Sequence, residues 1–495
     1  MSLINISKLT FAYPGSYDNI FEDVSFQMDT NWKLGFIGRN GRGKTTFFNL
    51  LLGRHEYMGN ITASVQFEYF PYEVDDKSIN TIDIINNVCP DYQDWELLKE
   101  LNLLQVSEDV MDRPFDTLSN GEQTKVLLAA LFLKENSFLL IDEPTNHLDI
   151  SGRKIVSAYL KSKSGFILVS HDRFFLDECV DHILSINKSN IEIERGNFSS
   201  WLINKERSDK YELAENEKLK REVKRLRETA REKAQWSNKA ESRKIGFDPI
   251  KTEKSLNRRP AEGAKAKKAM KRSKAIEKRL DDAYEEKSKL LKNIETAGDL
   301  KLSQLSFYTS QLIVLDDITI QYGDPIVCRN VSFVIEKGDR ISLSGKNGSG
   351  KSSIAKLICC QDIPHTGELK ISSRLQISYV SQDTSTLSGN LSDYAAEHHI
   401  DESLFKAILR KLDFERVQFE KDMGDFSGGQ KKKVLIARSL CEKAHLLVWD
   451  EPLNFIDVIS RMQIEKLLLE YKPTILFIEH DKAFCENIAT KNIIL

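Results

Sequence analysis

Two short glycine-rich segments of this chain have the composition and spacing of a phosphate-binding loop. Residues 38–45 read GRNGRGKT, and residues 345–352 read GKNGSGKS. In this Walker A pattern the glycines let backbone N–H groups surround phosphates, the lysine reaches the terminal phosphates, and the next hydroxyl holds Mg²⁺. Each segment therefore predicts a site for a nucleoside triphosphate. The residues expected to bind it are Gly38, Asn40, Gly41, Gly43, Lys44, Thr45 and Thr46, and in the second segment Gly345, Asn347, Gly348, Gly350, Lys351, Ser352 and Ser353.

Two apolar segments that end in paired carboxylates have the Walker B pattern of a buried parallel strand. Residues 137–144 read SFLLIDEP, and residues 445–452 read HLLVWDEP. Phosphoryl transfer depends on positioning and charge neutralisation, so the glutamates, Glu143 and Glu451, are expected to polarise the attacking water. The Mg²⁺ ligands predicted from these patterns are Thr45, Asp142, Ser352 and Asp450.

The elements around both loops repeat in register, about 308 residues apart. Ser119 lies 308 residues before Ser427, and His171 lies 309 residues before His480. Short apolar strands lead into each glycine loop and an apolar-periodic helix follows, which places the phosphates at a helix N-terminus. Coincidental glycine turns would not keep this register. The pattern predicts a tandem duplication of one α/β domain of about 190 residues.

Length and composition indicate a globular protein of about three domains, because the chain has 495 residues of which 41% are hydrophobic and 29% charged. The N-terminus lacks a leader pattern, and no apolar run approaches the roughly 18 residues of a membrane-spanning helix, so we expect a cytoplasmic protein. The seven cysteines form no C-x-x-C pair. Reduced core thiols are therefore expected, and neither a zinc site nor a disulfide framework.

The net charge of −3 conceals a strong asymmetry along the chain. Residues 203–295 hold 29 Lys and Arg against 18 Asp and Glu, whereas the remainder holds 42 against 56. Within 239–279 there are 15 basic and 5 acidic residues. Charge segregated in this way predicts that this one segment contacts a polyanion.

The basic segment is predicted to form a long antiparallel helical hairpin with a coiled-coil seam. Residues 203–240 contain neither Pro nor Gly, and in 269–294 six of eight heptad positions are apolar. Residues 241–264 contain Gly and Pro and are predicted to be the exposed tip loop. A solvated charged spacer is the alternative, but the basic excess favours binding to a phosphate backbone. Structured RNA is the better target, because the tip has few aromatic residues on which single strands could stack. Its candidate RNA-binding residues are Arg243, Lys244, Phe247, Lys251, Lys254, Arg258 and Arg259.

Two further motifs lie between the Walker patterns and resemble the signature of ATP-binding cassette (ABC) proteins. Residues 118–123 read LSNGEQ, and residues 426–430 read FSGGQ. A signature in this position occurs only in that superfamily. The resemblance implies that each nucleotide is held between the Walker A loop of one cassette and the signature of the other. The expected facing sets are Lys44 with Ser427, Gly429 and Gln430, and Lys351 with Ser119, Gly121 and Glu122.

The resemblance extends to other positions. His171 and His480 resemble the switch histidines that contact the γ-phosphate and the catalytic glutamate, and Tyr13 and Tyr322 resemble the aromatics that stack on adenine. For the tyrosines a core or strand-edge role is an equal alternative, because aromatic residues favour strands.

The two halves also depart from the family pattern in different ways. Gln382 fits the Q-loop ligand of Mg²⁺, but the first half offers Tyr72 at the corresponding place. Asn120 replaces a signature glycine, which is acceptable if its backbone is left-handed. Residues 145–149 form a regular D-loop, whereas 453–457 are looser. We therefore expect two inequivalent ATP sites.

Two cassettes, a linker of about 100 residues and no membrane span resemble the ABC-F translation factors over the whole chain. The predicted domains are two cassettes, 1–200 and 308–495, and the hairpin, 201–307. In that family the linker enters the E site of the 70S ribosome and approaches the P-site tRNA and the peptidyl transferase centre of the 23S rRNA. The resemblance implies a monomer that contacts neither membrane nor DNA.

Within that family the chain most resembles the Lsa-type resistance members, which protect bacterial ribosomes from lincosamides, streptogramin A and pleuromutilins. The spacings from Gly38 to Ser119 and from Gly345 to Ser427 are 81 and 82 residues, which leaves no room for the arm insertion of many housekeeping members. The chain also ends at Leu495, directly after a strand-like segment.

Three alternatives remain open. The first is a housekeeping ABC-F translation factor. The second is the tandem ATPase subunit of a membrane importer, which would not need the hairpin. The third is a DNA-directed ATPase of the excision-repair type, which would carry cysteine-rich metal modules that this sequence lacks.

Overall fold

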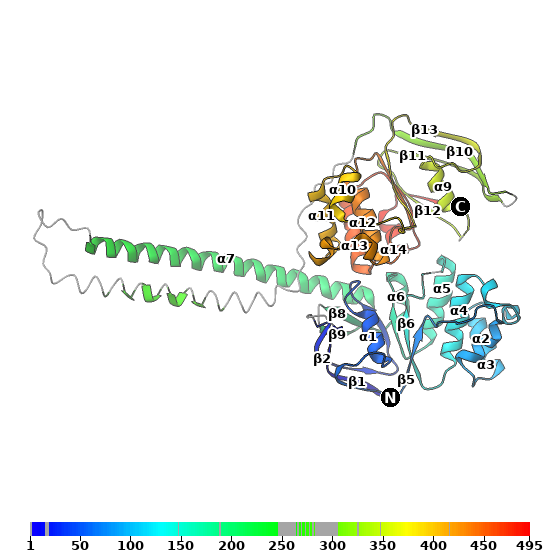
Figure 1. The fold of residues 1–495 in the computed structure, drawn as a ribbon, viewed down its shortest axis with the longest axis horizontal. Coiled ribbons are helices and arrows are strands. Elements are labelled where there is room, and N and C mark those ends of the chain that lie inside the picture. The colour runs from blue at the N-terminus through cyan, green and yellow to red at the C-terminus, as the bar shows by residue number, and fades with distance from the viewer. Residues whose placement is uncertain are drawn as a thin grey trace, which may run out of the picture. The chain divides into compact units, whose positions relative to one another are not determined.

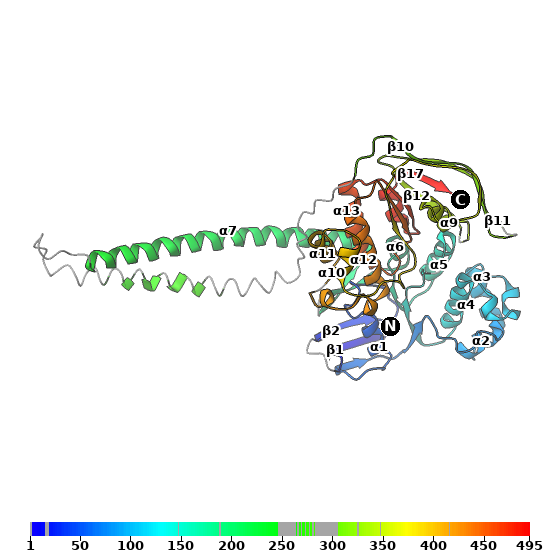
Figure 2. The same cartoon turned by 45° about the horizontal axis from the view of Figure 1, so that its top comes forward.

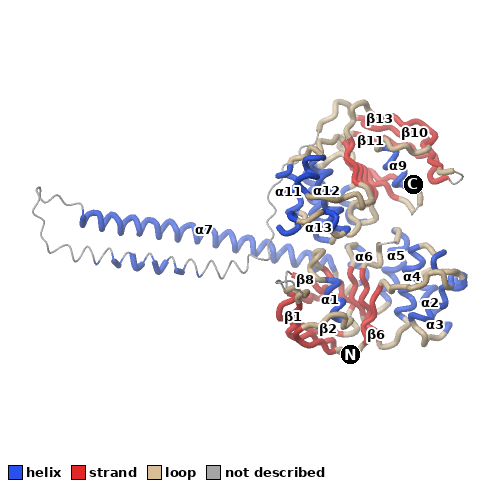
Figure 3. The backbone as a smooth tube through the Cα atoms, in the orientation of Figure 1, coloured by secondary structure: helices blue, strands red, loops and turns tan. Residues whose placement is uncertain are grey.

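The structure is a computed structural model. It describes residues 2–14, 19–146, 148–187, 190–245, 305–323, 326–346, 348–414 and 416–495, with a few separate positions between 264 and 282. The chain divides into two compact units. One unit joins Met1–Trp201 with Gly298–Leu495 and contains both predicted cassettes, and the other is Leu202–Ala297. Figure 3 shows the strands of the first unit and the long helix of the second.

Each cassette is built on a mostly parallel sheet. The order in the first cassette is β5-β6-β7-β3-β8-β9, with only β9 antiparallel to its neighbour. All four residues of β7 are buried, as expected for a parallel strand covered on both faces. The strands of this sheet are β3 (Lys33–Ile37), β5 (Gln66–Phe70), β6 (Ser137–Asp142), β7 (Phe166–Val169), β8 (His182–Asn187) and β9 (Asn190–Arg195).

The second cassette repeats this order. Its sheet is β14-β15-β16-β12-β17, and every pairing in it is parallel. The strands that carry the two predicted Walker B acids, β6 and β15, are therefore in equivalent places, next to the edge of each sheet. The strands are β12 (Arg340–Ser344), β14 (Ile377–Val380), β15 (Leu446–Asp450), β16 (Ile475–Ile478) and β17 (Lys491–Ile494). This repeat confirms the predicted α/β architecture with two tandem cassettes.

A three-stranded antiparallel sheet covers the nucleotide-loop side of each cassette. Their orders are β2-β1-β4 and β11-β10-β13. In the first cassette Phe21, Phe36 and Phe47 join this sheet, the parallel sheet and the helix after the glycine loop in one core. The strands are β1 (Leu3–Phe11), β2 (Phe21–Asp29), β4 (Met58–Thr62), β10 (Gln311–Gln321), β11 (Ile326–Glu336) and β13 (His365–Ile371).

The helices of each cassette form two groups. In the first cassette α2, α3, α4 and α5 lie on one side of β6, while α1 lies with β1 and β2 on the other (Figures 1 and 2). Its helices are α1 (Lys44–Leu51), α2 (Thr81–Val88), α3 (Asp94–Leu103), α4 (Asn120–Phe132), α5 (Ile150–Ser162) and α6 (Arg173–Cys179). Those of the second are α9 (Lys351–Ile358), α10 (Leu391–Glu397), α11 (Glu402–Lys411), α12 (Gly428–Cys441), α13 (Val458–Tyr471) and α14 (Lys482–Ile488).

The interdomain unit begins with one long helix, α7 (Phe198–Ile245), of 48 residues. At 1.5 Å per residue it extends roughly 72 Å. It continues into the segment predicted to be the tip loop, so Arg243 and Lys244 lie in its last turn. The other tip residues lie outside the described residues, namely Phe247, Lys251, Lys254, Arg258 and Arg259. The positions described between 264 and 282 are helical, but the predicted pairing of two helices stays a prediction.

In the described part of the chain, no helix is both long enough and apolar enough to cross a membrane.

Candidate nucleotide sites

Each glycine-rich loop turns into its helix through a left-handed glycine. Gly43 caps α1 with φ 95°, and Gly350 caps α9 with φ 90°. A Cβ at Gly43 would lie 2.5 Å from the side chain of Ile20, so both backbone angle and space exclude a larger residue. The first N–H groups of α1 and α9 are thereby directed into the loop, where an anion would be stabilised by the helix N-terminus.

Both Walker A lysines are buried within their own loops. The Lys44 Nζ donates to the carbonyls of Gly38, at 2.5 Å, and Arg39, at 3.2 Å. The Lys351 Nζ donates to the carbonyl of Gly345 at 3.0 Å. Burial lowers the pKa of both ammonium groups. The positive charge is therefore poorly solvated and available to a phosphate that enters the loop.

The predicted metal-binding aspartates stand at the ends of β6 and β15. In the second cassette the Ser352 Oγ donates to Asp450 Oδ1 at 3.0 Å. In the first cassette the Tyr69 hydroxyl donates to Asp142 Oδ2 at 3.2 Å. Burial raises the pKa of both aspartates, because desolvation disfavours a charged carboxylate.

The glutamate after each aspartate meets a histidine. The His171 Nε2 lies 3.3 Å from Glu143 Oε1, and the His480 Nε2 lies 3.8 Å from Glu451 Oε1. Both glutamates have left-handed backbones, with φ of 51° and 47°, a conformation that is costly outside glycine and concentrates at functional sites. Burial lowers the pKa of His480 to about 4 and that of His171 well below its usual range, so both rings are neutral near pH 7. Burial, reinforced by Asp142, raises the pKa of Glu143 to about 8.

A cavity of about 510 Å³ joins the first Walker A loop to the second signature. It reaches the carboxylate end of β6 and the switch histidine. Its lining is Tyr13, Ile20, Asn40, Gly41, Gly43, Lys44, Thr45, Thr46, Asp142, Glu143, Asn146, Val169, His171, Ser427, Gly428, Gly429 and Phe455.

A second cavity, of about 800 Å³, joins the second Walker A loop to the first signature. Its lining includes Ser119, Gly121, Glu122, Gly348, Gly350, Lys351, Ser352, Ser353, Gln382, Glu451 and His480. The structure thus brings each loop against the opposite signature, as the family resemblance implies. Within the described residues, Gly38, Tyr322, Gly345, Gln430 and Asp450 are not part of either lining, and Asn347 lies outside those residues.

The two candidate adenine aromatics differ in their surroundings. The Tyr13 hydroxyl lies 3.0 Å from Thr46 Oγ1, and its ring stands edge-on to Phe11 with centroids 5.1 Å apart. The Tyr322 hydroxyl donates to Ser353 Oγ at 3.2 Å. Both rings are about 40% exposed, at 41% and 43%, so each offers a surface on which a base can pack.

The signature serines begin helices. Ser119 caps α4 and Ser427 caps α12, and in both cases the third helical residue, Glu122 or Gln430, bonds back to the serine N–H at 2.9 Å. These two side chains therefore form capping boxes, a use that their predicted nucleotide contact did not anticipate. Asn120 does not have the left-handed backbone on which its acceptance in place of glycine was conditional. Asn120 is the first residue of α4, where a helical backbone accepts any side chain.

The signature of the second cassette packs closely on a loop that sequence reasoning had marked as irregular. A Cβ at Gly429 would lie 2.4 Å from the carbonyl oxygen of Phe455, so only glycine permits this approach. The same carbonyl accepts a bond from the Asn40 Nδ2 at 2.6 Å, and the Asn40 N–H lies 3.5 Å from Asp457 Oδ2. Sequence analysis missed Phe455 and Asp457, although their place after Glu451 in the second D-loop was a usable signal.

Two side chains extend this contact between the cassettes. Arg39 pairs with Asp413 at 2.9 Å, and the Arg153 guanidinium donates to the carbonyl of His480 at 3.1 Å. Neither was predicted, because an arginine within a glycine loop or a helix gives no sequence signal for a partner more than 300 residues away.

The two candidate catalytic glutamates, Glu143 and Glu451, have different hydrogen-bond partners. The Gln382 Nε2 donates to Glu451 Oε2 at 2.8 Å, and the Asn454 Nδ2 donates to the same oxygen at 2.7 Å. In the first cassette the hydroxyl that reaches the acidic pair is that of Tyr69, which bonds to Asp142, whereas the motif offers Tyr72 at the place of Gln382. The two candidate ATP sites therefore differ in the side chains that contact their acidic residues, and a difference in turnover stays a prediction.

The residues present fit a magnesium ion coordinated partly by the nucleotide. Ser352, Gln382 and Asp450 supply hydroxyl, amide and carboxylate oxygens, and Thr45 and Asp142 supply a hydroxyl and a carboxylate oxygen. Among the described residues no cluster of three His, Cys, Asp or Glu side chains is poised to hold a metal alone. This is the donor set typical of Mg²⁺, which binds through one or two carboxylates together with phosphates and waters.

A pair of composite cavities, each with a glycine loop from one half and a helix-capping serine from the other, defines a two-cassette nucleotide hydrolase. The family model described as ABC transporter matches residues 21–146 and 328–454. The chain belongs to this family of ABC ATPases and, within it, to the ABC-F proteins with two cassettes. It is an ABC-type ATPase that binds ATP through these cassettes.

Relatives are similar over nearly the whole chain. The ribosome protection protein VmlR of Bacillus subtilis is 26% identical over 505 residues, covering 100% of this chain and 86% of the relative. The ABC transporter F family member 2 of Arabidopsis thaliana is 25% identical, covering 99% and 76%. The energy-dependent translational throttle protein EttA of Haemophilus influenzae is 25% identical, covering 95% and 88%.

Proposed function

We propose that this ATPase acts on the bacterial ribosome. ATP binding and hydrolysis move its interdomain segment into and out of the E site, where it protects the peptidyl transferase centre from lincosamides, streptogramin A and pleuromutilins. The observation that carries the proposal is the similarity to VmlR, a protein named for ribosome protection, which spans this entire chain. The interdomain segment is therefore included in the match along with the ATPase cassettes.

In the proposed cycle each nucleotide closes the contact between two cassettes. The lysines Lys44 and Lys351 attract the terminal phosphates, and the N-termini of α4 and α12 supply N–H groups from the opposite side. Mg²⁺ would neutralise phosphate charge when bound with ATP. Glu143 and Glu451 orient the attacking water, and the neutral histidine beside each glutamate has one N–H to donate. Hydrolysis removes the phosphate that bridges the two faces, and the cassettes release.

The interdomain segment supplies the proposed RNA contact. Its excess of basic over acidic residues, 29 against 18, contrasts with the acidic remainder of the chain. We infer that α7 pairs with a second helix over 269–294, and that the basic tip between them follows the phosphate backbone of rRNA and the P-site tRNA. Phe247 is the aromatic residue of this tip and is proposed to make an apolar contact near the drug site.

Drug susceptibility tests this function. Expression of the chain in a sensitive bacterium should raise the inhibitory concentrations of the three drug classes, and should leave those of drugs acting at the small ribosomal subunit unchanged. Ribosome binding without protection would instead identify a housekeeping translation factor. Co-purification with an integral membrane permease would overturn the proposal in favour of an importer subunit.

The tip can be tested separately through its salt dependence. Four alanine substitutions, at Lys251, Lys254, Arg258 and Arg259, should weaken ribosome co-sedimentation. The log–log slope against salt should flatten by roughly 3 to 4 if all four side chains contact phosphates. The matched control removes four exposed basic residues of α7, Lys210, Lys218, Arg221 and Lys224. An equal effect of both sets would contradict a specific role of the tip.

Phe247→Ala is the complementary variant. One side chain adds little to an electrostatically held complex, so ATPase activity and ribosome binding should stay near wild type while protection falls. Unchanged inhibitory concentrations would exclude this contact and leave the rest of the proposal in place.

A further inference from the structure

A buried lysine in the second cassette connects three segments of its ATP site. Lys432 lies on α12 and is only 1% exposed. Its Nζ donates to the carbonyl of Ser381 at 2.9 Å and to the carbonyl of Glu451 at 3.1 Å. Ser381 immediately precedes Gln382, and Glu451 follows β15. One ammonium group therefore holds the signature helix, the Gln382 loop and the backbone of the catalytic glutamate together.

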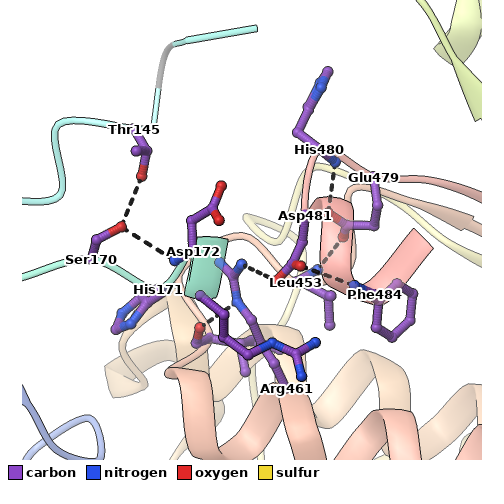
Figure 4. Close-up of polar contacts among 12 residues, drawn as sticks. Thr145, Ser170, His171, Asp172, Leu453, Arg461, Glu479, His480, Asp481 and Phe484 are labelled. Carbon is purple, nitrogen blue, oxygen red and sulfur yellow. Dashed lines mark hydrogen bonds and ion pairs between the residues drawn. The ribbon is translucent and has the colours of Figure 1, made fainter. Parts of the chain in front are cut away.

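A second buried charged side chain, Glu479, follows directly after β16. Glu479 is 4% exposed, and its two oxygens accept bonds from the N–H groups of Leu453, at 2.7 Å, and His480, at 3.2 Å (Figure 4). Burial lowers the pKa of Lys432, and Glu479 leads the carboxylates that oppose this effect, while the cation that most lowers the pKa of Glu479 is Arg461. A charge taken out of water at this depth is stable only beside such a partner.

The first cassette has hydroxyls at both equivalent positions. The Thr124 Oγ1 donates to the carbonyl of Asn120 in its own helix, at 2.9 Å. The Ser170 Oγ lies 3.4 Å from Thr145 Oγ1 and accepts from the Asp172 N–H at 3.2 Å (Figure 4). The Thr124 bond stays within its own helix, and the Ser170 bonds join the loop after β7 to the loop after β6 and to Asp172. Lys432 and Glu479 thus occur together in the second cassette, and hydroxyl side chains replace both in the first.

We propose that Lys432 is a positioning residue for hydrolysis in the second ATP site and that Glu479 acts together with it. Gln382 and Asn454 both donate hydrogen bonds to the Glu451 carboxylate. Displacement of the loop that carries Gln382 would therefore displace this carboxylate as well. A shift of about 1 Å at a reacting group costs about 10²-fold in rate. Because α12 begins beside Ser427, whose signature lines the other cavity, the same ammonium links the two ATP sites.

This inference rests on the proposed role of Glu451 in hydrolysis and is independent of the ribosome. It is tested in the full chain carrying Glu143→Gln, so that steady-state turnover reports the second site. Three variants are compared in that background: Lys432→Thr, the pair Lys432→Thr with Glu479→Ser, and the matched control Lys431→Thr one residue away on α12. The paired variant reproduces the hydroxyls of the first cassette, and so removes the buried Glu479 carboxylate together with one of the cations that attract it.

We expect kcat to fall 10-fold to 100-fold in the paired variant, with the KM for ATP and the thermal midpoint close to the parent. Lys432→Thr alone should lower both kcat and the thermal midpoint, and Lys431→Thr should retain kcat within twofold. A paired variant with kcat within twofold of the parent, or one in which only KM changes, would overturn the inference. Adding Glu451→Gln to the same background separates the role of Glu451 in hydrolysis from the role of Lys432 in positioning. If that variant still hydrolyses ATP, the role of Glu451 is wrong. If it is inactive while the paired variant keeps the parent's kcat, only the role of Lys432 is wrong.

Discussion

The two glycines of the second signature provide a matched pair that tests the sandwich geometry. A Cβ at Gly429 would lie 2.4 Å from the Phe455 carbonyl oxygen, whereas one at Gly428 would be 3.6 Å from the nearest Phe455 ring atom, an ordinary contact. The first contact must lengthen by roughly 1 Å to reach normal packing separation. Displacement of that size at a reacting centre costs about 10²-fold in rate. Both positions begin the same helix, so alanine removes similar backbone freedom at each.

The assay uses chains that carry Glu451→Gln, so that turnover reports the cavity containing Lys44. Gly429→Ala should lower kcat about 100-fold, and Gly428→Ala should lower it far less, with similar thermal midpoints for both variants. Equal rates for the two alanine variants would refute the close approach of this signature to the Phe455 loop, and with it the arrangement of the smaller cavity.

Three further outcomes are expected. Replacing both Glu143 and Glu451 with Gln should preserve nucleotide binding, measured with a fluorescent ATP analogue, and lower turnover by about 10²- to 10⁴-fold. The single variants should differ in turnover, because Gln382 and Asn454 grip only Glu451; identical rates would contradict the inequivalence of the sites. Burial raises the pKa of Glu479 from 4.5 to about 7. The stability that this residue contributes by binding a proton is therefore complete below about pH 4.5 and is lost as the pH rises to about 7. Between pH 5 and pH 7 the thermal midpoint of Glu479→Gln should fall less than that of the parent, and parallel curves would exclude this linkage.

Local patterns were sufficient for the cassettes and for most of the candidate site. Glycine loops, apolar strands that end in acids and helix-capping serines have their structure determined within a few residues, so their identity and order follow from sequence. Their fixed register also predicted the duplication, which the matching sheet orders confirm. The family resemblance added what no local pattern contains, namely that each signature faces the opposite loop.

Contacts set by tertiary packing were not predictable from the same patterns. Lys432 lies in a run of three lysines and reads as a solvated helix face, although its ammonium is buried against two carbonyls. Tyr69, not Tyr72, reaches Asp142, because the pairing of β5 with β6 decides which side chain faces the acid. Asn120 needs no left-handed backbone, because it is the first residue of α4.

The most direct measurement of the central claim is co-sedimentation of the Glu143→Gln, Glu451→Gln double variant with purified 70S ribosomes. A chain that binds the ribosome in its ATP-closed form and leaves after hydrolysis should accumulate on ribosomes in ATP, and should bind far less in ADP or without nucleotide. The wild-type chain should bind less than the variant in ATP. Absence of ribosome binding by the double variant in ATP, under conditions in which it still binds the nucleotide, would contradict the account.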